Sequence, residues 1–515
     1  MAAAAQSTQN IQIQPGEKWW GAATGLAPAM PFDGEKTVSI DQRVQDFNNQ
    51  LSPLLISSKG RGIWSDGPLD INIADGNISI SASRSSIEVA TYGSTLRDAY
   101  TGLMRKHFPP ASDGIPPEEL FASPTYNTWI ELVYDQNQAD VMRYAKGIVA
   151  NGFRPGVLMI DDNWQRDYGE WEFRAERFND PKAMVDSLHQ MGFKVMLWVC
   201  PFVSADSKKG RDLAQKGYLL KRKGSNQPAV VEWWNGYSHV YDLSNDEARA
   251  YLKAEFTDLQ RRYGIDGFKF DAGDPGYYDS ATASAADGKS YDVEQARLWA
   301  KLGSEFEYNE MRACWGEANT RLVQRLGDKD YSWNAVAQLV PGMIAAGLQG
   351  YAYTCPDMIG GGGYTSFYGI DPDKFDQKLI VRSCQIHSMM PIMQFSVAPW
   401  RILDKRHLDI CRQYAQWHHK LSAYIIDQAR KSAHTGEPIV RAMDYCFPGE
   451  GFEGVTDQYM LGDRYLVAPV YTQHDRRTVR LPRGKWRDDQ GKTWRGGRSY
   501  TIDVPIERLP WFEKI

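Results

Sequence analysis

The chain has 515 residues, more than one hydrophobic core usually holds, so we expect two or three domains, one of which can be a barrel of about 250 residues. It carries 59 lysines and arginines against 64 aspartates and glutamates, well mixed, and the net charge of −5 argues against nucleic acid or an anionic membrane as a partner. The six cysteines lack metal-like spacing and the nine histidines are scattered, so we expect no disulfide framework, no metal and no other cofactor.

The amino-terminal part reads as a β-domain, which we place at residues 1–118. The opening MAAAAQSTQNIQ lacks the charged and apolar regions of an intact signal peptide. The compartment stays open, and a periplasmic or secreted protein whose signal peptide has been replaced is one alternative. From Trp19 to Arg105, short alternating segments broken by turn residues, including Asp75-Gly76, predict antiparallel strands. The proline-rich residues 107–124 predict a linker.

The middle part, residues 119–432, alternates apolar strands with helical patterns, which predicts parallel strands with crossover helices. The expected strands lie within residues 128–136, 157–164, 193–203, 266–274, 311–319, 350–357 and 389–396. A doubly wound sheet is the alternative, but its ligand groups would gather at one switch point. Nearly every strand here ends in polar or aromatic residues, so we predict a (β/α)8 TIM barrel, followed by a carboxy-terminal β-sandwich at residues 433–515.

Two pairs of charged residues are candidates for acid–base chemistry. Lys269 and Asp271 are two residues apart on an expected strand, so their side chains face the same way, and a nearby ammonium keeps a carboxylate ionised. A structural ion pair is the alternative. Asp328 and Asp330 follow an apolar segment in an expected loop. A glycosidase needs two carboxyl groups about 5 to 5.5 Å apart for retention or about 6.5 to 9.5 Å apart for inversion, a distance that a sequence does not contain.

Further strand ends offer carboxylates and indoles. Asp161 and Asp162 end a buried strand together, which is costly unless they bind a ligand, a metal or an arginine. Trp198 and the adjacent indoles Trp233 and Trp234 are as suited to the core as to a sugar platform, and the aromatic content of 12% leaves the same two alternatives open. The four glycines from 360 to 363 lack the context of a phosphate loop and predict a tight rim loop.

The sequence resembles glycoside hydrolase family 31 from about Leu51 onward. The stretches that carry the resemblance are VLMIDDNWQRDYGEWEFRAERFNDPKAMVDSLHQMGFKVMLWVCPF, DGFKFDAGD, RLGDKDYSW and DQYMLGDRYLVAPV. The resemblance implies that Asp271 is the catalytic nucleophile and Asp328 the general acid/base. It further implies that Arg312, Asp161 and Asp357 bind the substrate.

Three departures from the family pattern bear on the sugar. Where α-glucosidases of the family have a tryptophan, a second aspartate and an Arg-Asn-His triplet, this chain has Lys269, Cys200 and residues 394–396, which read Gln-Phe-Ser. The D-D-x-W strand end at 161–164 and the K-x-D strand at 269–271 are similar to those of α-galactosidase families. The stretch MMPIMQFSVAPW resembles the myogenesis-regulating glycosidase branch of family 31, which implies α-galactosidase activity.

We therefore expect a retaining, exo-acting α-galactosidase whose partner is an oligosaccharide or other glycoside. Besides the two catalytic aspartates, the expected substrate-binding residues are Asp161, Asp162, Trp164, Trp198, Trp234, Lys269, Arg312 and Asp357. The alternatives are an α-glucosidase, an α-xylosidase or an α-N-acetylgalactosaminidase on the same machinery, and a carbohydrate-binding protein without turnover. Association of copies through a β-domain stays open.

Overall fold

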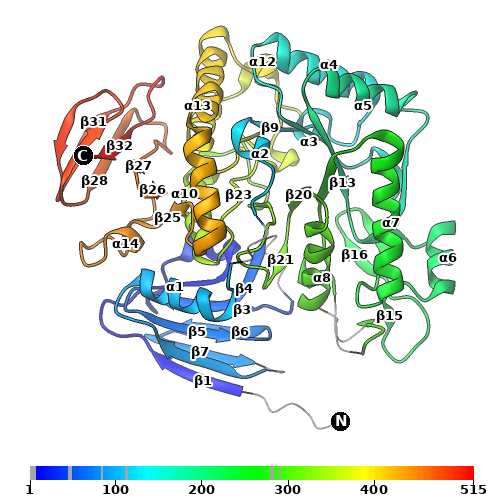
Figure 1. The fold of residues 1–515 in the computed structure, drawn as a ribbon, viewed down its shortest axis with the longest axis horizontal. Helices are drawn as coiled ribbons and strands as arrows, with labels where there is room; N and C mark the ends of the chain where they lie inside the picture. Colours follow the sequence, from blue (N-terminus) through cyan, green and yellow to red (C-terminus); the bar gives the residue numbers. More distant parts are fainter. Residues whose placement is uncertain (1–6, 45–48, 83–84, 111–113, 279–282, 289–291) are drawn as a thin grey trace.

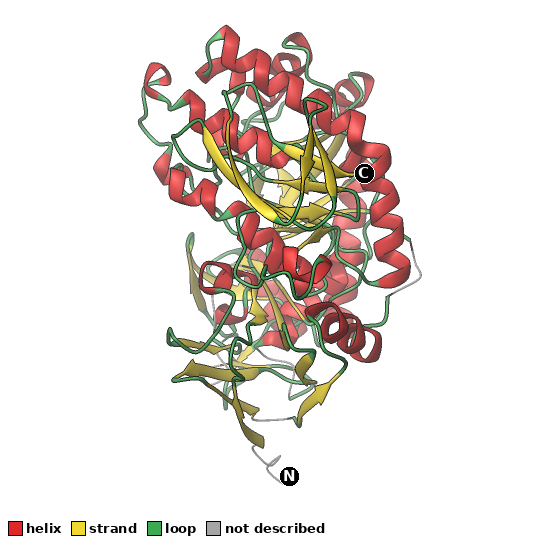
Figure 2. Ribbon diagram, turned by 90° about the vertical axis from the view of Figure 1, so that its left-hand side faces the viewer, coloured by secondary structure: helices red, strands yellow, loops and turns green. Residues whose placement is uncertain are grey.

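The computed structural model describes residues 7–44, 49–82, 85–110, 114–278, 283–288 and 292–515. Figure 1 shows a central barrel with a β-domain at its foot, drawn in blue, and a second β-rich domain beside it, drawn in orange and red. In the turned view of Figure 2 the carboxy-terminal strands lie in front of the barrel and the amino-terminal strands below it. None of the helices in the described ranges is long and apolar enough to cross a membrane.

The amino-terminal domain consists of two antiparallel sheets, as the alternating pattern predicts. One sheet has the order β1-β7-β6-β3 and the other β2-β4-β5-β8. Their bounds are β1 Ser7–Gln12, β2 Trp19–Ala23, β3 Val38–Asp41, β4 Gln50–Ser57, β5 Arg61–Ser65, β6 Leu69–Ala74, β7 Asn77–Ala82 and β8 Ile87–Thr91. Asp75 and Gly76 both adopt positive φ in the turn between β6 and β7, the backbone that a tight hairpin requires. The helix α1 (Leu96–His107) begins at a capping box between Thr95 and Asp98.

The middle part is the predicted parallel barrel. Its eight strands follow the order β23-β22-β20-β18-β13-β10-β9-β24, with parallel pairing throughout. Their bounds are β9 Thr125–Asn127, β10 Val157–Ile160, β13 Lys194–Val199, β18 Gly267–Phe270, β20 Tyr308–Met311, β22 Gln324–Arg325, β23 Thr354–Cys355 and β24 Gln394–Phe395. The ring closes just beyond β23, where the N–H of Ile359 donates to the carbonyl of Gln394 at 2.8 Å.

Helices cover the outside of this barrel (Figure 1). The main ones are α4 Gln138–Ala150, α5 Pro181–Gln190, α7 Asp246–Tyr263, α8 Val293–Ser304, α10 Leu339–Leu348, α11 Gln377–His387 and α13 Lys405–Thr435. Several of them start with a side chain that accepts from the first turn, such as Asn137 before α4 and Asp180 before α5. Because each strand is buried by helices outside and by facing strands inside, its carboxyl end is where polar groups reach solvent.

Two strand predictions differ from the structure, and one barrel strand was not predicted. Residues 128–136 begin with helix α3 (Trp129–Leu132) instead of a strand, because the Asn127 side chain accepts the N–H of Trp129 at 2.8 Å and turns the chain. In 311–319, strand β20 ends at Met311, and the following β21 (Cys314–Trp315) pairs with β4 of the amino-terminal domain. Strand β22 has two residues and so leaves no periodic pattern in the sequence.

The carboxy-terminal domain is β-rich. A six-stranded sheet of order β25-β26-β27-β32-β29-β30 is accompanied by a two-stranded antiparallel sheet of β28 and β31. The strands are β25 Val440–Arg441, β26 Tyr459–Leu461, β27 Tyr465–Val467, β28 Arg476–Leu481, β29 Lys485–Asp488, β30 Thr493–Arg495, β31 Arg498–Asp503 and β32 Trp511–Lys514. Trp486 is fully buried in their shared core.

Candidate active site

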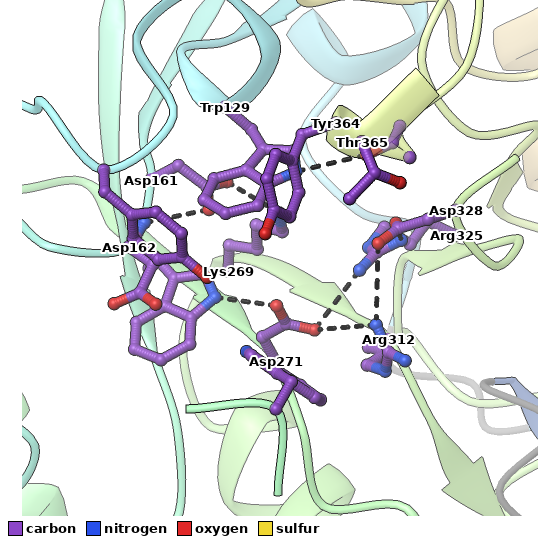
Figure 3. A pocket seen from close by; sticks show the side chains of 15 residues that line it. Trp129, Asp161, Asp162, Lys269, Asp271, Arg312, Arg325, Asp328, Tyr364 and Thr365 are labelled. Atoms are coloured by element: carbon purple, nitrogen blue, oxygen red, sulfur yellow. Dashed lines mark hydrogen bonds and ion pairs between the residues drawn. The ribbon is translucent and has the colours of Figure 1, made fainter. Parts of the chain in front are cut away.

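A cavity of about 280 Å³ opens at the carboxyl ends of the barrel strands, at the small end of the range of ligand pockets (Figure 3). The residues that line it are Trp129, Tyr134, Asp161, Asp162, Trp198, Trp234, Lys269, Asp271, Arg312, Arg325, Asp328, Gly362, Gly363, Tyr364 and Thr365. Four carboxylates and three cations therefore meet at one aromatic-walled pocket.

Asp271 follows strand β18 directly and lies at the centre of this pocket. The indole N–H of Trp198, on the neighbouring β13, donates to its Oδ2 at 2.7 Å. Arg325 Nη2 lies 3.2 Å and Arg312 Nη1 3.6 Å from its Oδ1. Burial would raise the pKa of Asp271, but the two guanidinium groups, Lys269 and the Trp198 N–H together hold that pKa well below its usual range. The carboxylate is therefore ionised, as a nucleophile requires.

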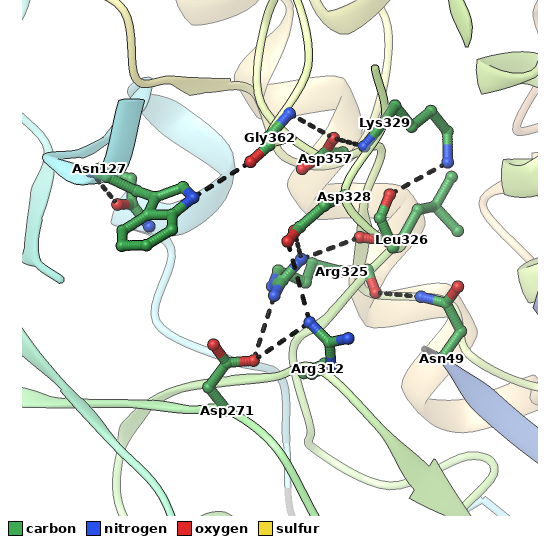
Figure 4. A network of polar contacts seen from close by, with 12 residues as sticks. Asn49, Asn127, Asp271, Arg312, Arg325, Leu326, Asp328, Lys329, Asp357 and Gly362 are labelled. Carbon is green, nitrogen blue, oxygen red and sulfur yellow. Dashed lines mark hydrogen bonds and ion pairs between the residues drawn. The ribbon is translucent and has the colours of Figure 1, made fainter. Parts of the chain in front are cut away.

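Asp328 follows strand β22 and faces Asp271 across the two arginines (Figure 4). Its Oδ1 accepts from Arg325 Nη1 at 2.6 Å, and the Arg312 Nη1 that approaches Asp271 lies 3.9 Å from its Oδ2. Desolvation and the charge of Asp271 raise the pKa of Asp328, while Arg325 and Arg312 lower it by more. Both carboxylates thus lie within 4 Å of one guanidinium nitrogen, an arrangement that suits work on a single bond.

Lys269 and Asp161 form a buried ion pair in the wall of the cavity. Lys269 Nζ lies 2.7 Å from Asp161 Oδ2, and each side chain is 3% exposed. Lys269 comes from β18 and Asp161 directly follows β10, so the pair joins two strands that are separated by β13. Lys269 faces the same pocket as Asp271, but its ion-pair contact is with Asp161, and arginines make the close contacts with Asp271.

Asp162 also lines the cavity and anchors its neighbours. Its carboxylate accepts from Gln165 at 2.9 Å, from Tyr168 at 3.0 Å and from Asn235 at 2.9 Å. Burial raises the pKa of Asp162 to about 7, because these neutral donors offset only part of the lost hydration. Asn235 lies at the tip of the hairpin formed by β16 (Val231–Trp233) and β17 (Gly236–Val240), so Asp162 holds this hairpin at the pocket.

Aromatic rings form opposite walls. Trp234, at the same hairpin tip, is 42% exposed, and the Arg312 guanidinium lies 4.8 Å from its ring centre. Trp129, Tyr134 and Tyr364 pack edge to face in a second cluster, with the Trp129 indole N–H donating to the Gly362 carbonyl at 3.1 Å. Such rings are suited to the apolar face of a sugar.

Two of the predicted binding residues lie outside this lining. The backbone turns at Asn163, where φ is +81°, so Trp164 points into the core, packs on Phe173 and donates to the Trp198 carbonyl at 2.8 Å. Asp357 lies behind the wall, where its Oδ2 accepts from the backbone N–H groups of Lys329 at 2.8 Å and Gly362 at 3.0 Å. Both are 1% exposed or less.

The sequence interpretation missed several pocket residues. Arg325, Trp129, Tyr134, Tyr364 and Thr365 line the cavity. A signal for Arg325 was present, since this arginine precedes Asp328 by three residues at a strand end. The expected rim loop at 360–363 does contribute Gly362 and Gly363. In the described part of the chain, no group of three or more His, Cys, Asp or Glu side chains is placed to hold a metal ion.

Comparisons with known proteins agree with this fold. Residues 124–428 match the model described as the glycosyl hydrolases family 31 TIM-barrel domain, and residues 436–514 match the family's C-terminal domain. The myogenesis-regulating glycosidase of Mus musculus is 30% identical over 429 residues, which cover 81% of this chain and 59% of that protein. An α-xylosidase of Emericella nidulans is 24% identical, covering 97% of this chain and 66% of that protein.

Solved structures share the fold. A family 31 dextranase from Flavobacterium johnsoniae complexed with glucose superposes with a TM-score of 0.86 at 20% identity, covering 100% of this chain and 67% of that one. A family 31 α-xylosidase from a soil metagenome complexed with xylose has the same TM-score at 23% identity, covering 99% of this chain and 80% of that one. The chain spans 59%, 33% and 51% of the length of the first three curated relatives, so their activities do not transfer directly.

Proposed function

The chain belongs to glycoside hydrolase family 31, and from this membership and the pocket chemistry we propose that it is a retaining, exo-acting α-galactosidase. The observation that carries the sugar assignment is the buried pair of Lys269 and Asp161 in the cavity wall. The small cavity supports an enzyme that encloses one terminal sugar ring.

Galactose differs from glucose in its axial O4 hydroxyl. A lysine ammonium beside an aspartate carboxylate offers that hydroxyl one donor and one acceptor at once. A sugar with O4 in the other orientation leaves the remaining donor and acceptor positions of these desolvated groups unfilled, which is more costly than a lost contact in water. The pair therefore favours a galactoside over a glucoside.

Asp271 is the proposed nucleophile. In the first step its carboxylate attacks the anomeric carbon while Asp328 transfers a proton to the leaving glycosidic oxygen. In the second step Asp328 takes a proton from water, which attacks the same carbon, breaks the bond to Asp271 and restores the α configuration. Arg312 and Arg325 contact both carboxylates and so balance the charge that shifts between them.

The charge of Asp271 supports the two roles of Asp328. As long as Asp271 is ionised, its negative charge raises the pKa of Asp328 and opposes the lowering by Arg325 and Arg312. Formation of the glycosyl-enzyme removes that charge, so the pKa of Asp328 falls and the residue becomes a base. For the acid step, the 2.6 Å contact of Arg325 with Asp328 must loosen when substrate enters, because a guanidinium this close stabilises the ionised form.

Trp234 is the proposed platform for the leaving group. Its exposed ring lies against Arg312, which in turn approaches the acid/base Asp328. Trp198, Trp129 and Tyr364, which line the cavity, are the proposed walls around the galactosyl ring itself. Neither role needs a cofactor.

The test is hydrolysis of p-nitrophenyl α-galactoside beside the α-glucoside, α-xyloside and α-N-acetylgalactosaminide by the purified protein. Release of nitrophenol from the galactoside with the highest kcat/KM supports the proposal. A higher kcat/KM for one of the other sugars contradicts the assignment of galactose and identifies that sugar as the preferred one. Binding of galactose without hydrolysis of any member of the panel supports a carbohydrate-binding protein instead.

A further inference from the structure

Next to the active site, the segment that follows a barrel strand pairs with a strand of the amino-terminal domain. After β20 ends at Met311, the chain passes through Arg312 and Ala313 into β21, which pairs in parallel with β4 of the amino-terminal domain. The register aligns Cys314 with Gln50. Arg312, which contacts both catalytic candidates, therefore lies on a two-residue link between two sheets.

Gln50 occupies the point where these sheets meet. Its side chain is fully buried, and its Nε2 donates to the carbonyl of Arg312 at 3.0 Å and to the carbonyl of Arg325 at 2.9 Å. The hydroxyl of Thr24 donates to its Oε1 at 3.1 Å. Because the two carbonyls only accept, the amide nitrogen must face them. The amide oxygen then faces the Thr24 hydroxyl and accepts its hydrogen bond. Asn49 adds a second donor to the Arg325 carbonyl at 3.1 Å (Figure 4).

The side-chain amide of Gln50 links the backbones of β20 and β22 just beyond the point where their pairing ends. The register between β20 and β22 holds one residue pair, Met311 with Gln324, in the described chain. The next residue on each strand is an arginine of the active site, and Gln50 bridges their carbonyls. The two backbones that carry Arg312 and Arg325 are thus fixed relative to each other by a side chain from another domain.

We propose that Gln50 is a positioning residue of the glycosidase reaction, which sets the spacing of the two arginines that hold Asp271 and Asp328. The inference rests on the proposed function of that site. The amino-terminal domain is then part of the catalytic apparatus and more than an accessory to it. The family model begins at residue 124, so it does not cover Gln50.

The test compares Gln50→Met with Gln42→Met. Gln42 is a matched control, because it is equally buried in the same domain and its Nε2 also donates to two carbonyls, those of Ala22 at 3.0 Å and Ser52 at 2.8 Å. Each variant is measured on the nitrophenyl α-glycoside that the wild type hydrolyses best, for kcat, KM and the pH profile, with thermal unfolding recorded beside them.

Gln50→Met is expected to lower kcat by about 10- to 100-fold with little change in KM, since displacements near 1 Å cost this much when the substrate still binds. Its pH profile should move to higher pH, because arginines that sit further away lower the pKa of the carboxylates less. Gln42→Met should lose thermal stability while keeping the kcat and pH profile of the wild type. If Gln50→Met behaves like Gln42→Met, the proposal is wrong.

Two further measurements cover the remaining outcomes. Should Gln50→Met not fold, Thr24→Val removes only the hydroxyl that orients the amide, and a kcat equal to that of the wild type overturns the proposal while a reduced kcat supports it. Should the wild type hydrolyse none of the glycosides, the proposed function fails on its own. The pH dependence of galactose, glucose and xylose binding, measured by calorimetry, then decides the role of Gln50. It must shift to higher pH in Gln50→Met and stay that of the wild type in Gln42→Met, because only Gln50 sets the distance of the arginines from the carboxylates.

Discussion

The ammonium of Lys269 lies 2.7 Å from Asp161 Oδ2, and the two side chains are each 3% exposed where they meet the cavity. Each of these buried charges depends on the other, because bulk water cannot solvate either one if its partner is removed. The same isolation makes the pair sensitive to which sugar hydroxyl approaches it.

Lys269→Met should separate galactoside from glucoside hydrolysis. We expect kcat/KM for the α-galactoside to fall by roughly 100-fold or more, and that for the α-glucoside to fall less, because the lost donor served the axial hydroxyl. The free energy of unfolding should fall by about 3–5 kcal/mol, since Asp161 is left unpaired in the interior. Lys209→Met, which breaks the ion pair with Glu255 away from the pocket, is the control and should leave the sugar preference unchanged. An equal loss on both sugars in Lys269→Met would contradict the assignment.

Asp162 gives the folded protein a predicted pH dependence. Burial raises its pKa from 3.8 to about 7, so between these values the folded chain keeps a proton that the unfolded chain has lost. Stability from this group is therefore greatest at low pH and falls as pH rises through that window.

Asp162→Asn should remove the loss of stability that Asp162 causes as the pH rises. In urea unfolding at pH 5 and pH 8, the wild type should lose more stability between the two pH values than the variant, by about 2–3 kcal/mol, because only the part of the window from pH 5 to about 7 is sampled. Asp135→Asn, an exposed residue, should behave like the wild type. The same pH dependence in Asp162→Asn and in the wild type would show that another group is responsible.

Gly362→Ala tests how closely the glycine loop fits the acid/base. A Cβ at this position would lie 2.7 Å from Asp357 Oδ1, closer than side chains tolerate, and 3.1 Å from Asp328 Oδ1, tighter than most such contacts. We expect kcat to fall by about 10- to 100-fold, because Asp357, which holds the N–H of Lys329 next to Asp328, must shift and Asp328 itself must give slightly. Gly363→Ala, whose Cβ would lie 3.2 Å from the Lys329 carbonyl, is the neighbouring control and should lose less activity. Similar kcat values for the two variants would count against a tight fit at Asp328.

Trp234→Ala tests the leaving-group platform. We expect KM for the nitrophenyl galactoside to rise several-fold, in line with about 0.5–1.5 kcal/mol for a pair of aromatic rings, with a smaller effect on kcat. Tyr237→Ala, 64% exposed on the same hairpin, should leave KM unchanged. An unchanged KM in Trp234→Ala would place the leaving group elsewhere.

The sequence was sufficient for the fold and for those site residues whose geometry is local. The period of two on a strand places Lys269 and Asp271 on one face, and both line the cavity. Alternation of strands and helices predicted the parallel barrel, and the comparisons with family 31 confirm it.

Residues whose role depends on backbone turns or distant contacts could not be predicted in this way. Trp164 follows the D-D-x-W pattern, yet the positive φ at Asn163 turns it into the core. Asp357 holds two backbone N–H groups from loops far apart in the sequence. Gln50 reaches Arg312 and Arg325 across more than 260 positions, a contact without any local signal.

The most direct test of the central claim is the product that Asp271→Ala forms from p-nitrophenyl α-galactoside in the presence of azide, identified by NMR. If Asp271 is the nucleophile, the variant should not hydrolyse the substrate by itself, and azide should enter from the vacated side and give β-galactosyl azide. Asp328→Ala, which still forms the glycosyl-enzyme, should give α-galactosyl azide under the same conditions. Hydrolysis by Asp271→Ala at the rate of the wild type, or α-galactosyl azide from that variant, would contradict the assignment of Asp271.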